Sequence, residues 1–260
     1  MKFRFLYFGD VVGRPGREFL LSCLPKIKEH YLPDFIFLNG ENAAGGFGLT
    51  KAIAHEFLNA GIDAISMGNH TWDQKNFWAE IDSTPFVCRP ANLPSLCPGK
   101  PYCIVEKDQV KVALLNILGR SFISLPLDCP FVTAEKWIRF LKDEGAEAVI
   151  VDVHAEASAE KCALGYYLME HGATAVLGTH THIQTSDERI IGGKTAYITD
   201  LGMCGVRESV LGFSIEPVIK KSITSLPCRF EVASGDVWLH GVCVDVDHGE
   251  AVHIERIMWK

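Results

Sequence analysis

The sequence has no apolar run of the length that a bilayer crossing needs, about 20 residues. Its first eight residues are too short for a signal peptide and lead directly into a glycine-containing loop, so we interpret them as a core strand. A basic surplus is also lacking, because the formal net charge is −7, which disfavours stable binding to nucleic acid. We therefore expect a cytoplasmic protein with neither a membrane nor a nucleic-acid partner.

No Cys-x-x-Cys motif occurs among the nine cysteines, and their number is odd. A zinc ribbon or a disulfide framework is therefore not expected. Cys103 and Cys243 lie inside apolar strand-like runs, where free cysteine packs as a small hydrophobic side chain. We expect reduced thiols.

Low-complexity linkers are absent as well, in a chain whose 260 residues could form one large domain or two small ones. Hydrophobic residues make up 48% of the chain and charged residues 22%, which is typical of a compact body. Residues 206–227 are predicted to be irregular, and 236–257 to form two antiparallel strands. We expect a single domain over 1–260, with a lid or insertion near 207–230.

Apolar segments with strand character alternate along the chain with glycine-rich turns and helical stretches. The strands are predicted at 3–8, 35–38, 64–67, 112–117, 148–153, 173–177 and 195–199. The helices are predicted at 17–30, at 51–60, after a cap at Thr133, and at 158–171. Pro25 is expected to bend or shorten the first helix. This alternation indicates an α/β fold of mixed sheets with helices outside.

Polar residues follow several of these strands at the point where each strand ends. Three times in the first 73 residues, a strand ends in glycine followed by aspartate, glutamate or asparagine. In 178–182 two histidines follow a buried strand, and the neighbouring glycine and threonines let the chain leave strand geometry. Because loops beyond the carboxyl ends of strands converge, we expect these side chains in one crevice. The residues are Asp10, Glu41, Asn42, Asn69, His70, His154, His180 and His182.

These side chains provide oxygen and nitrogen ligands without a thiolate, which suits two hard or borderline divalent ions. A carboxylate such as Glu41 can bridge two ions. Two ions about 3.5–4 Å apart lower the pKa of a bridging water and bind a phosphate for in-line displacement. An imidazole such as His70 can carry a proton near neutral pH. The pattern therefore favours a dinuclear hydrolytic site.

Five segments in this order carry a specific resemblance: GDVVGRPG, NGENAAGG, GNHTWD, DVHAEASAEK and GTHTHIQTSD. Together they resemble the motifs of the calcineurin-like metallophosphoesterases, and more closely those of the YmdB-like branch, a bacterial family of cyclic-nucleotide phosphodiesterases. The superfamily has histidine where Val12 stands and aspartate in the second motif, where this chain has Glu41 and Asn42; the branch shares both departures. The resemblance spans residues 4–215 and implies a sandwich of two mixed β-sheets flanked by helices.

The resemblance also implies roles for the strand-end residues. One metal ion would be held by Asp10, Glu41, Asn42 and His182, and the other by Glu41, Asn69, His154 and His180. His70 would be the catalytic proton donor to the leaving oxygen. Iron is the expected metal, divalent or as a mixed-valence pair, with manganese as the alternative. The implied reaction converts a 2′,3′-cyclic nucleotide, a small-molecule partner, to a nucleoside 3′-phosphate, with 3′,5′-cyclic nucleotides as potential further substrates.

Several alternatives stay open at this stage. A phosphomonoesterase or nuclease would use the same ligands, and a non-catalytic metal-binding signalling protein could keep the fold. A homo-oligomer is also left open. Asp73 could orient His70 or cap a helix, and Asp152 could support the site or only the fold. Arg14 could contact phosphate or solvent. Three further histidines are expected to be solvated: His240, His248 and His253.

Overall fold

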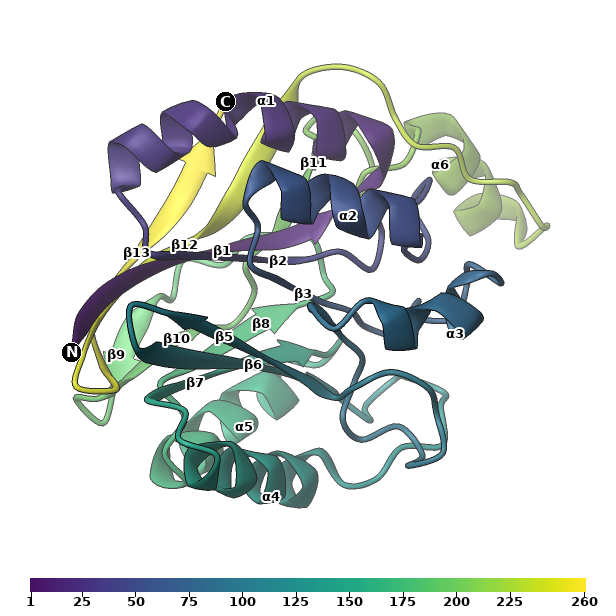
Figure 1. Cartoon of the computed structure of the whole chain (residues 1–260). Coiled ribbons are helices and arrows are strands. Elements are labelled where there is room, and N and C mark those ends of the chain that lie inside the picture. Colours follow the sequence, from purple (N-terminus) through teal and green to yellow (C-terminus); the bar gives the residue numbers. More distant parts are fainter.

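Two mixed β-sheets pack face to face in the computed structural model, which describes residues 1–260 (Figure 1). The first sheet contains β1 (Lys2–Val11), β2 (Phe35–Asn39), β3 (Ala64–Ser66), β4 (Val87–Cys88), β11 (Met203–Val206), β12 (Val237–Asp247) and β13 (Glu250–Trp259). The second contains β5 (Tyr102–Lys107), β6 (Val110–Leu118), β7 (Ala148–His154), β8 (Ala175–Thr179), β9 (Arg189–Ile191) and β10 (Thr195–Ile198). Their spatial orders are β13-β12-β11-β1-β2-β3-β4 and β5-β6-β7-β8-β10-β9.

Helices cover the outer face of each sheet. The first sheet carries α1 (Gly13–Tyr31) and α2 (Lys51–Ala60), and the second carries α4 (Pro130–Asp143) and α5 (Ser158–Glu170) (Figure 1). Short α3 (Phe77–Glu80), the 3-10 turn η1 (Ile81–Ser83) and α6 (Ile215–Thr224) complete the helical elements. The predicted sandwich of two mixed sheets flanked by helices is therefore confirmed. The single domain and its lid stay predictions.

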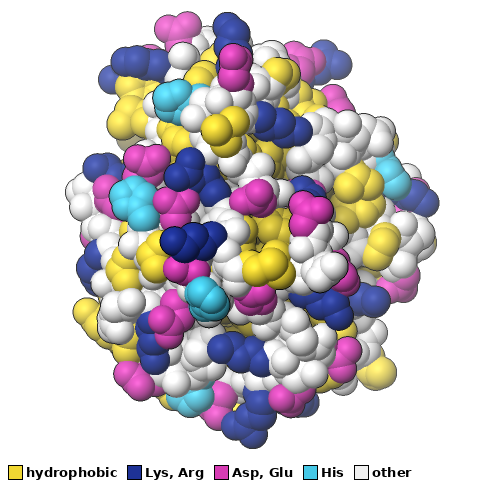
Figure 2. Space-filling view, turned by 60° about the vertical axis from the view of Figure 1, so that its left-hand side comes forward, with side chains coloured by type: hydrophobic (Ala, Val, Ile, Leu, Met, Phe, Trp, Pro, Cys, Tyr) yellow, Lys and Arg dark blue, Asp and Glu magenta, His cyan; other side chains and the backbone are white.

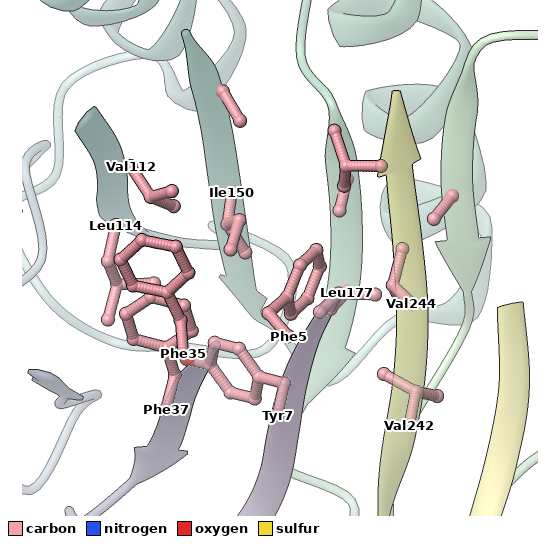
Figure 3. Packing of buried hydrophobic residues seen from close by; sticks show 14 of the residues in the cluster. Phe5, Tyr7, Phe35, Phe37, Val112, Leu114, Ile150, Leu177, Val242 and Val244 are labelled. Carbon is pink, nitrogen blue, oxygen red and sulfur yellow. The ribbon is translucent and has the colours of Figure 1, made fainter. Parts of the chain in front are cut away.

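Successive residues of β1 enter two different cores. Phe5 and Tyr7 point toward the second sheet and pack with residues such as Ile150 (Figure 3). Leu6 and Phe8 point to the opposite side and join the core beneath the outer helices. Because β1 is covered on both faces, its segment 5–8 is hydrophobic at every position instead of alternating with polar residues. The parallel pairing of β1, β2 and β3 places their carboxyl ends at one edge, as does that of β6, β7 and β8.

The prediction that Thr133 caps this helix was wrong, since α4 begins about one helical turn earlier. Its first residue is Pro130 and its N-cap is Cys129, whose carbonyl oxygen accepts from Thr133 N at 3.0 Å. Proline is preorganised for the first helical position, so the helix starts without a side-chain cap. Thr133 lies inside the helix.

The prediction of an irregular 206–227 was also wrong in part, because α6 occupies Ile215–Thr224. Pro217 resembles a helix breaker in the sequence, but it stands in the first turn, where its missing N–H costs no intrahelical bond. Similarly, α1 continues past Pro25 to Tyr31 and is not shortened.

The surface shows no dominance of one charge on the face in Figure 2, where basic and acidic side chains are interspersed. That face offers no broad basic patch for a nucleic-acid backbone. None of the helices combines the length and the apolar character that crossing a membrane demands.

Replacing Phe37 by alanine is expected to lower the free energy of unfolding by about 3–5 kcal/mol. Phe37 is fully buried, and its ring centroid lies 6.1 Å from that of Phe5 and 6.2 Å from those of Tyr7 and Phe35. Urea unfolding checks the loss. The control is Phe122→Ala, since Phe122 is 87% exposed and its loss should change the free energy by less than about 0.5 kcal/mol. Equal unfolding midpoints for the two variants would contradict the packing described.

Candidate metal centre

The strand-end residues predicted from the sequence meet at the carboxyl edges of both sheets. Asp10 lies near the end of β1, Glu41 and Asn42 follow β2, and Asn69 and His70 follow β3. His154 is the last residue of β7, and His180 and His182 follow β8. The fold thus brings residues from five strands, separated by up to 172 positions between Asp10 and His182, into one region.

One group of ligand atoms surrounds His154 Nε2. Glu41 Oε1 lies 3.0 Å from it, and Asn69 Oδ1 and His180 Nδ1 each lie 3.1 Å from it. The ligand atoms of Glu41, His154 and His180 all lie within 4.8 Å of one another. This is the set that the resemblance implied for one of the two ions.

A second group gathers around Asp10. Asp10 Oδ1 lies 3.8 Å from His182 Nε2, is buried, and has no hydrogen-bond partner. Its other oxygen, Oδ2, accepts from His180 N at 3.1 Å. Asn42 shows the same arrangement, because its Nδ2 donates to Gly46 O at 3.1 Å while its buried Oδ1 is unpaired. Buried oxygens without a partner are costly, and a cation would satisfy them.

In His154, His180 and His182, one ring nitrogen lies within hydrogen-bond distance of an acceptor oxygen outside the ligand groups. Thr179 Oγ1 donates to Asp152 Oδ1 at 2.6 Å, so it accepts from His154 Nδ1 at 2.8 Å. His182 Nδ1 lies 3.0 Å from Leu211 O, and His180 Nε2 lies 3.1 Å from a Glu156 oxygen. The other nitrogen of each ring faces the ligand groups, where it would bind a metal ion in its deprotonated form. Such second contacts orient metal-binding imidazoles, so the residues fit a metal centre.

Burial and the charges of neighbouring residues shift the pKa values of these groups. Burial alone would lower the pKa of His154, but the Glu41 carboxylate raises it to about 9. Burial and the neighbouring His154 lower the pKa of His180 to about 3. Burial tends to raise the pKa of Glu41, but His154 outweighs it and brings the value to about 2. Burial raises the pKa of Asp10 to about 6. Burial disfavours the charged form of these carboxylates, and a positive charge beside them stabilises it. A bound cation can supply that charge.

The chain leaves strand geometry where the two histidines stand, as the sequence predicted. His180 has φ of 98° and His182 has φ of 66°, values that residues other than glycine seldom adopt. Gly178 is needed just before them, because a Cβ there would overlap Thr199 O. Strained backbone of this kind persists where the surrounding structure holds it, often at functional sites.

A buried ion pair holds this strained segment and was missed in the sequence. Asp200 Oδ2 accepts from Lys161 Nζ at 2.6 Å and from Thr181 N at 3.0 Å. Both charged side chains are 1% exposed. The available signal was the position of Lys161, three residues before Leu164 and seven before Leu168, on the buried face of α5.

His70 lies beside the ligand atoms without belonging to either group. Its backbone N donates to Glu41 Oε2 at 3.0 Å, and its Nδ1 lies 2.8 Å from Asp73 Oδ2. The ring of Phe47 packs edge-on against it, with centroids 5.0 Å apart. Asp73 does not cap a helix, because α3 begins only at Phe77 with Asn76 before it. The contact favours the interpretation of Asp73 as the residue that orients His70.

Asp152 supports the site from the space between the sheets. Its fully buried carboxylate accepts from four side chains: Tyr7, Ser66, Asn39 and Thr179. Through Thr179 it fixes the proton of His154 on Nδ1, and Asn39 also donates to Met67 O just before the β3 loop. The sequence left this role open because burial of a single aspartate cannot be derived from a strand pattern.

Arg14 is exposed, and its Nε lies 3.3 Å from Glu18 Oε1. The preceding residue, Gly13, donates its N–H to Asn42 O at 2.9 Å. His240 is not solvated as expected: its Nδ1 is buried without a partner, and burial lowers its pKa. It stands on β12, a strand whose face toward the second sheet is covered, whereas His248 and His253 are exposed.

The two-sheet sandwich, with carboxylate, amide and histidine ligands gathered at its strand ends, defines a metallophosphoesterase. The family described as YmdB-like protein matches residues 6–257. The chain is 47% identical over 260 residues to the 2′,3′-cyclic-nucleotide 2′-phosphodiesterase of Bacillus subtilis strain 168, covering 98% of this chain and 96% of the relative. The chain therefore belongs to the YmdB-like family.

Two solved structures agree with this assignment. A crystal structure of a hypothetical protein from Thermus thermophilus is 38% identical, with a TM-score of 0.91 over 98% of each chain. A crystal structure of a novel phosphatase from Mycoplasma pneumoniae is 32% identical, with a TM-score of 0.91 over 99% of this chain and 93% of that one.

Proposed function

We propose that this protein hydrolyses 2′,3′-cyclic nucleotides to nucleoside 3′-phosphates with two divalent metal ions. The chain is a phosphoric diester hydrolase, supported by its family and by its 47% identity to a relative with the name 2′,3′-cyclic-nucleotide 2′-phosphodiesterase. The observation that carries the dinuclear proposal is the pair of ligand groups around His154 and Asp10, which approach one another where His154 Nδ1 lies 3.9 Å from Asp10 Oδ1.

Each ligand group would hold one ion. Asp10, Asn42 and His182 would bind the first ion, Asn69, His154 and His180 the second, and Glu41 would bridge both. Bound at these positions, the ions would lower the pKa of a water molecule near the phosphate and neutralise the phosphate oxygens. Iron is the proposed metal, with manganese as the alternative, because the mixed oxygen and nitrogen ligands suit both.

His70 would act at the leaving group. Attack of water on phosphorus forms one P–O bond as the bond to the 2′ oxygen breaks, and that oxygen needs a proton. With Nδ1 held by Asp73 at 2.8 Å, Nε2 of His70 is left to donate it. The product is then a 3′-phosphate with a free 2′ hydroxyl. A 3′,5′-cyclic nucleotide could be opened by the same chemistry, which we propose as a second, slower reaction.

A substrate comparison tests the proposal. Anaerobically purified protein, with its metal content measured in parallel, is assayed with 2′,3′-cyclic AMP, 3′,5′-cyclic AMP, single-stranded DNA and a phosphomonoester. We expect turnover of 2′,3′-cyclic AMP to 3′-AMP and about two metals per chain. Preferred cleavage of the monoester or of DNA would replace the proposal with a phosphatase or a nuclease. Two metals without any turnover would favour a signalling protein that keeps the site.

Asp73→Asn is expected to lower kcat for 2′,3′-cyclic AMP about tenfold while leaving the metal content unchanged. The effect should be modest because Asp73 is 43% exposed and water screens its charge. Steady-state kinetics and metal analysis check both parts. Asp108→Asn, at an exposed turn position, is the matched control and should behave as the wild type. An unchanged kcat in Asp73→Asn would show that Asp73 does not orient His70.

A further inference from the structure

A cavity of about 290 Å³ lies directly beside the candidate metal centre. It is lined by residues from the loop after β8, from β11 and the residue that follows it, and from β12 and β13, among them His182, Gln184, Met203, Arg207, Trp238 and His240. His182 belongs to both places, since its Nε2 faces Asp10. Met203 is the β-sheet partner of Asp10 in the pairing of β11 with β1. The cavity and the ligand group around Asp10 therefore share a wall.

A series of flat groups forms one side of this cavity. The guanidinium of Arg207 lies over the ring of Trp238 with its carbon 4.1 Å from the ring centroid. The ring of His240 lies edge-on to Trp238, with centroids 6.2 Å apart. Guanidinium planes and indole rings are the surfaces on which proteins stack nucleobases.

The lining of the cavity also includes large apolar side chains that are exposed to solvent. Ile183 is 62% exposed and Met258 is 54% exposed, although both have large apolar side chains. Neighbouring exposed apolar groups beside a polar site are typical of a surface that binds a ligand. A flat ring between these residues and the Trp238 side would cover them from water.

Polar groups that could read a base edge converge on the same cavity. Gln184 Nε2 donates to Gly241 O at 3.1 Å and to Ile257 O at 3.2 Å, which fixes the side chain and leaves its Oε1 as a free acceptor. Arg256 adds donors and is held by Glu188 at 2.9 Å. Fixed donors and acceptors beside an apolar surface are what a nucleobase requires.

We infer that this cavity binds the nucleoside of the substrate, with the base packed against Arg207 and Trp238. The inference rests on the proposed function, because the cyclic phosphate must lie at the metal centre for the base to reach the cavity. The volume is near the lower end of the range for small-ligand sites, about 300–1,000 Å³, which suits one nucleoside better than an oligonucleotide.

The test compares two substrates on metal-loaded enzyme: 2′,3′-cyclic AMP and methyl riboside 2,3-cyclic phosphate, which has a methoxy group in place of the base. Trp238→Leu should lower kcat/KM for cyclic AMP about tenfold, mainly through KM, and leave that for the base-free substrate unchanged. Trp238→Phe keeps an aromatic face and should stay within about threefold of the wild type. Trp78→Leu, on α3 and 51% exposed, is the matched control and should leave both substrates unaffected.

The outcomes separate this inference from the proposed function. An equal fall with both substrates, or no fall with cyclic AMP, would overturn the nucleoside site. If the wild type cleaves neither substrate, the proposed function fails, and calorimetric binding of adenosine, which has no phosphate, decides about the cavity. Binding to the wild type that is lost in Trp238→Leu would support the site, and absence of binding to the wild type would overturn it.

Discussion

His70→Ala is expected to lower kcat for 2′,3′-cyclic AMP by about 10²–10⁴-fold while both metal ions stay bound. The loss is large because the 2′ oxygen would leave without a positioned proton donor. The metals should stay because His70 contacts Glu41 only through its backbone N, at 3.0 Å, which alanine keeps. Kinetics with metal analysis of the same preparation measures both effects.

The control and a substrate with a better leaving group make this prediction sharper. His253→Ala removes an exposed imidazole and should leave kcat unchanged. A p-nitrophenyl phosphodiester has a leaving group that needs little protonation, so His70→Ala should lose much less activity with it than with cyclic AMP. Equal losses with both substrates would exclude His70 as the proton donor, and loss of metal would assign it a structural role.

Glu41→Gln is expected to reduce the metal content from about two ions per chain to fewer than one and to lower kcat by more than about 100-fold. The carboxylate is 1% exposed, with Oε1 3.0 Å from His154 Nε2 and Oε2 accepting from His70 N. Its Oε1 therefore belongs to the group around His154, and we propose that the carboxylate also binds the ion near Asp10. Glutamine keeps the volume but removes the negative charge and one acceptor oxygen, so both ions lose a ligand.

Metal analysis after dialysis measures this loss, and thermal unfolding adds an independent readout. Because bound ions stabilise only the folded state, the wild type should lose thermal stability on chelation, and Glu41→Gln should show little further change. Glu18→Gln, an exposed glutamate on α1, is the matched control and should retain two ions. Two ions retained in Glu41→Gln would disprove the bridging role.

The strand ends show how far sequence patterns reach in this fold. Gly9-Asp10, Gly40-Glu41-Asn42 and Gly68-Asn69-His70 follow apolar runs, and the structure places all three segments at the carboxyl ends of parallel strands. The pattern is readable because apolar runs and the glycine-containing turns that end them are local properties of the sequence. Helix boundaries were predicted less well. Pro130 is the first residue of α4 and Pro217 lies in the first turn of α6, and in the sequence both prolines resembled helix breakers.

Supporting contacts could not be derived in this way. Asp73 stands three residues after His70, a spacing that fits either a helix cap or a contact with the imidazole, and only the backbone path decides for the contact. The pair of Lys161 and Asp200 joins α5 to the loop that follows β10 across 39 positions. The sequence predicted a solvated His240. Its Nδ1 is buried instead, because segments from distant parts of the chain pack over it.

By itself, the sequence determined the family, the two-sheet sandwich and the candidate ligands, because their types and order are carried by short local motifs. The tertiary structure decided which ligand atoms face one another, which nitrogen of each histidine ring faces the site, and that Asp152 holds His154 through Thr179. It also decided that Arg207, Trp238 and His240 form one wall beside His182. These are distances between residues far apart in the chain, and they exist only after the two sheets have packed together.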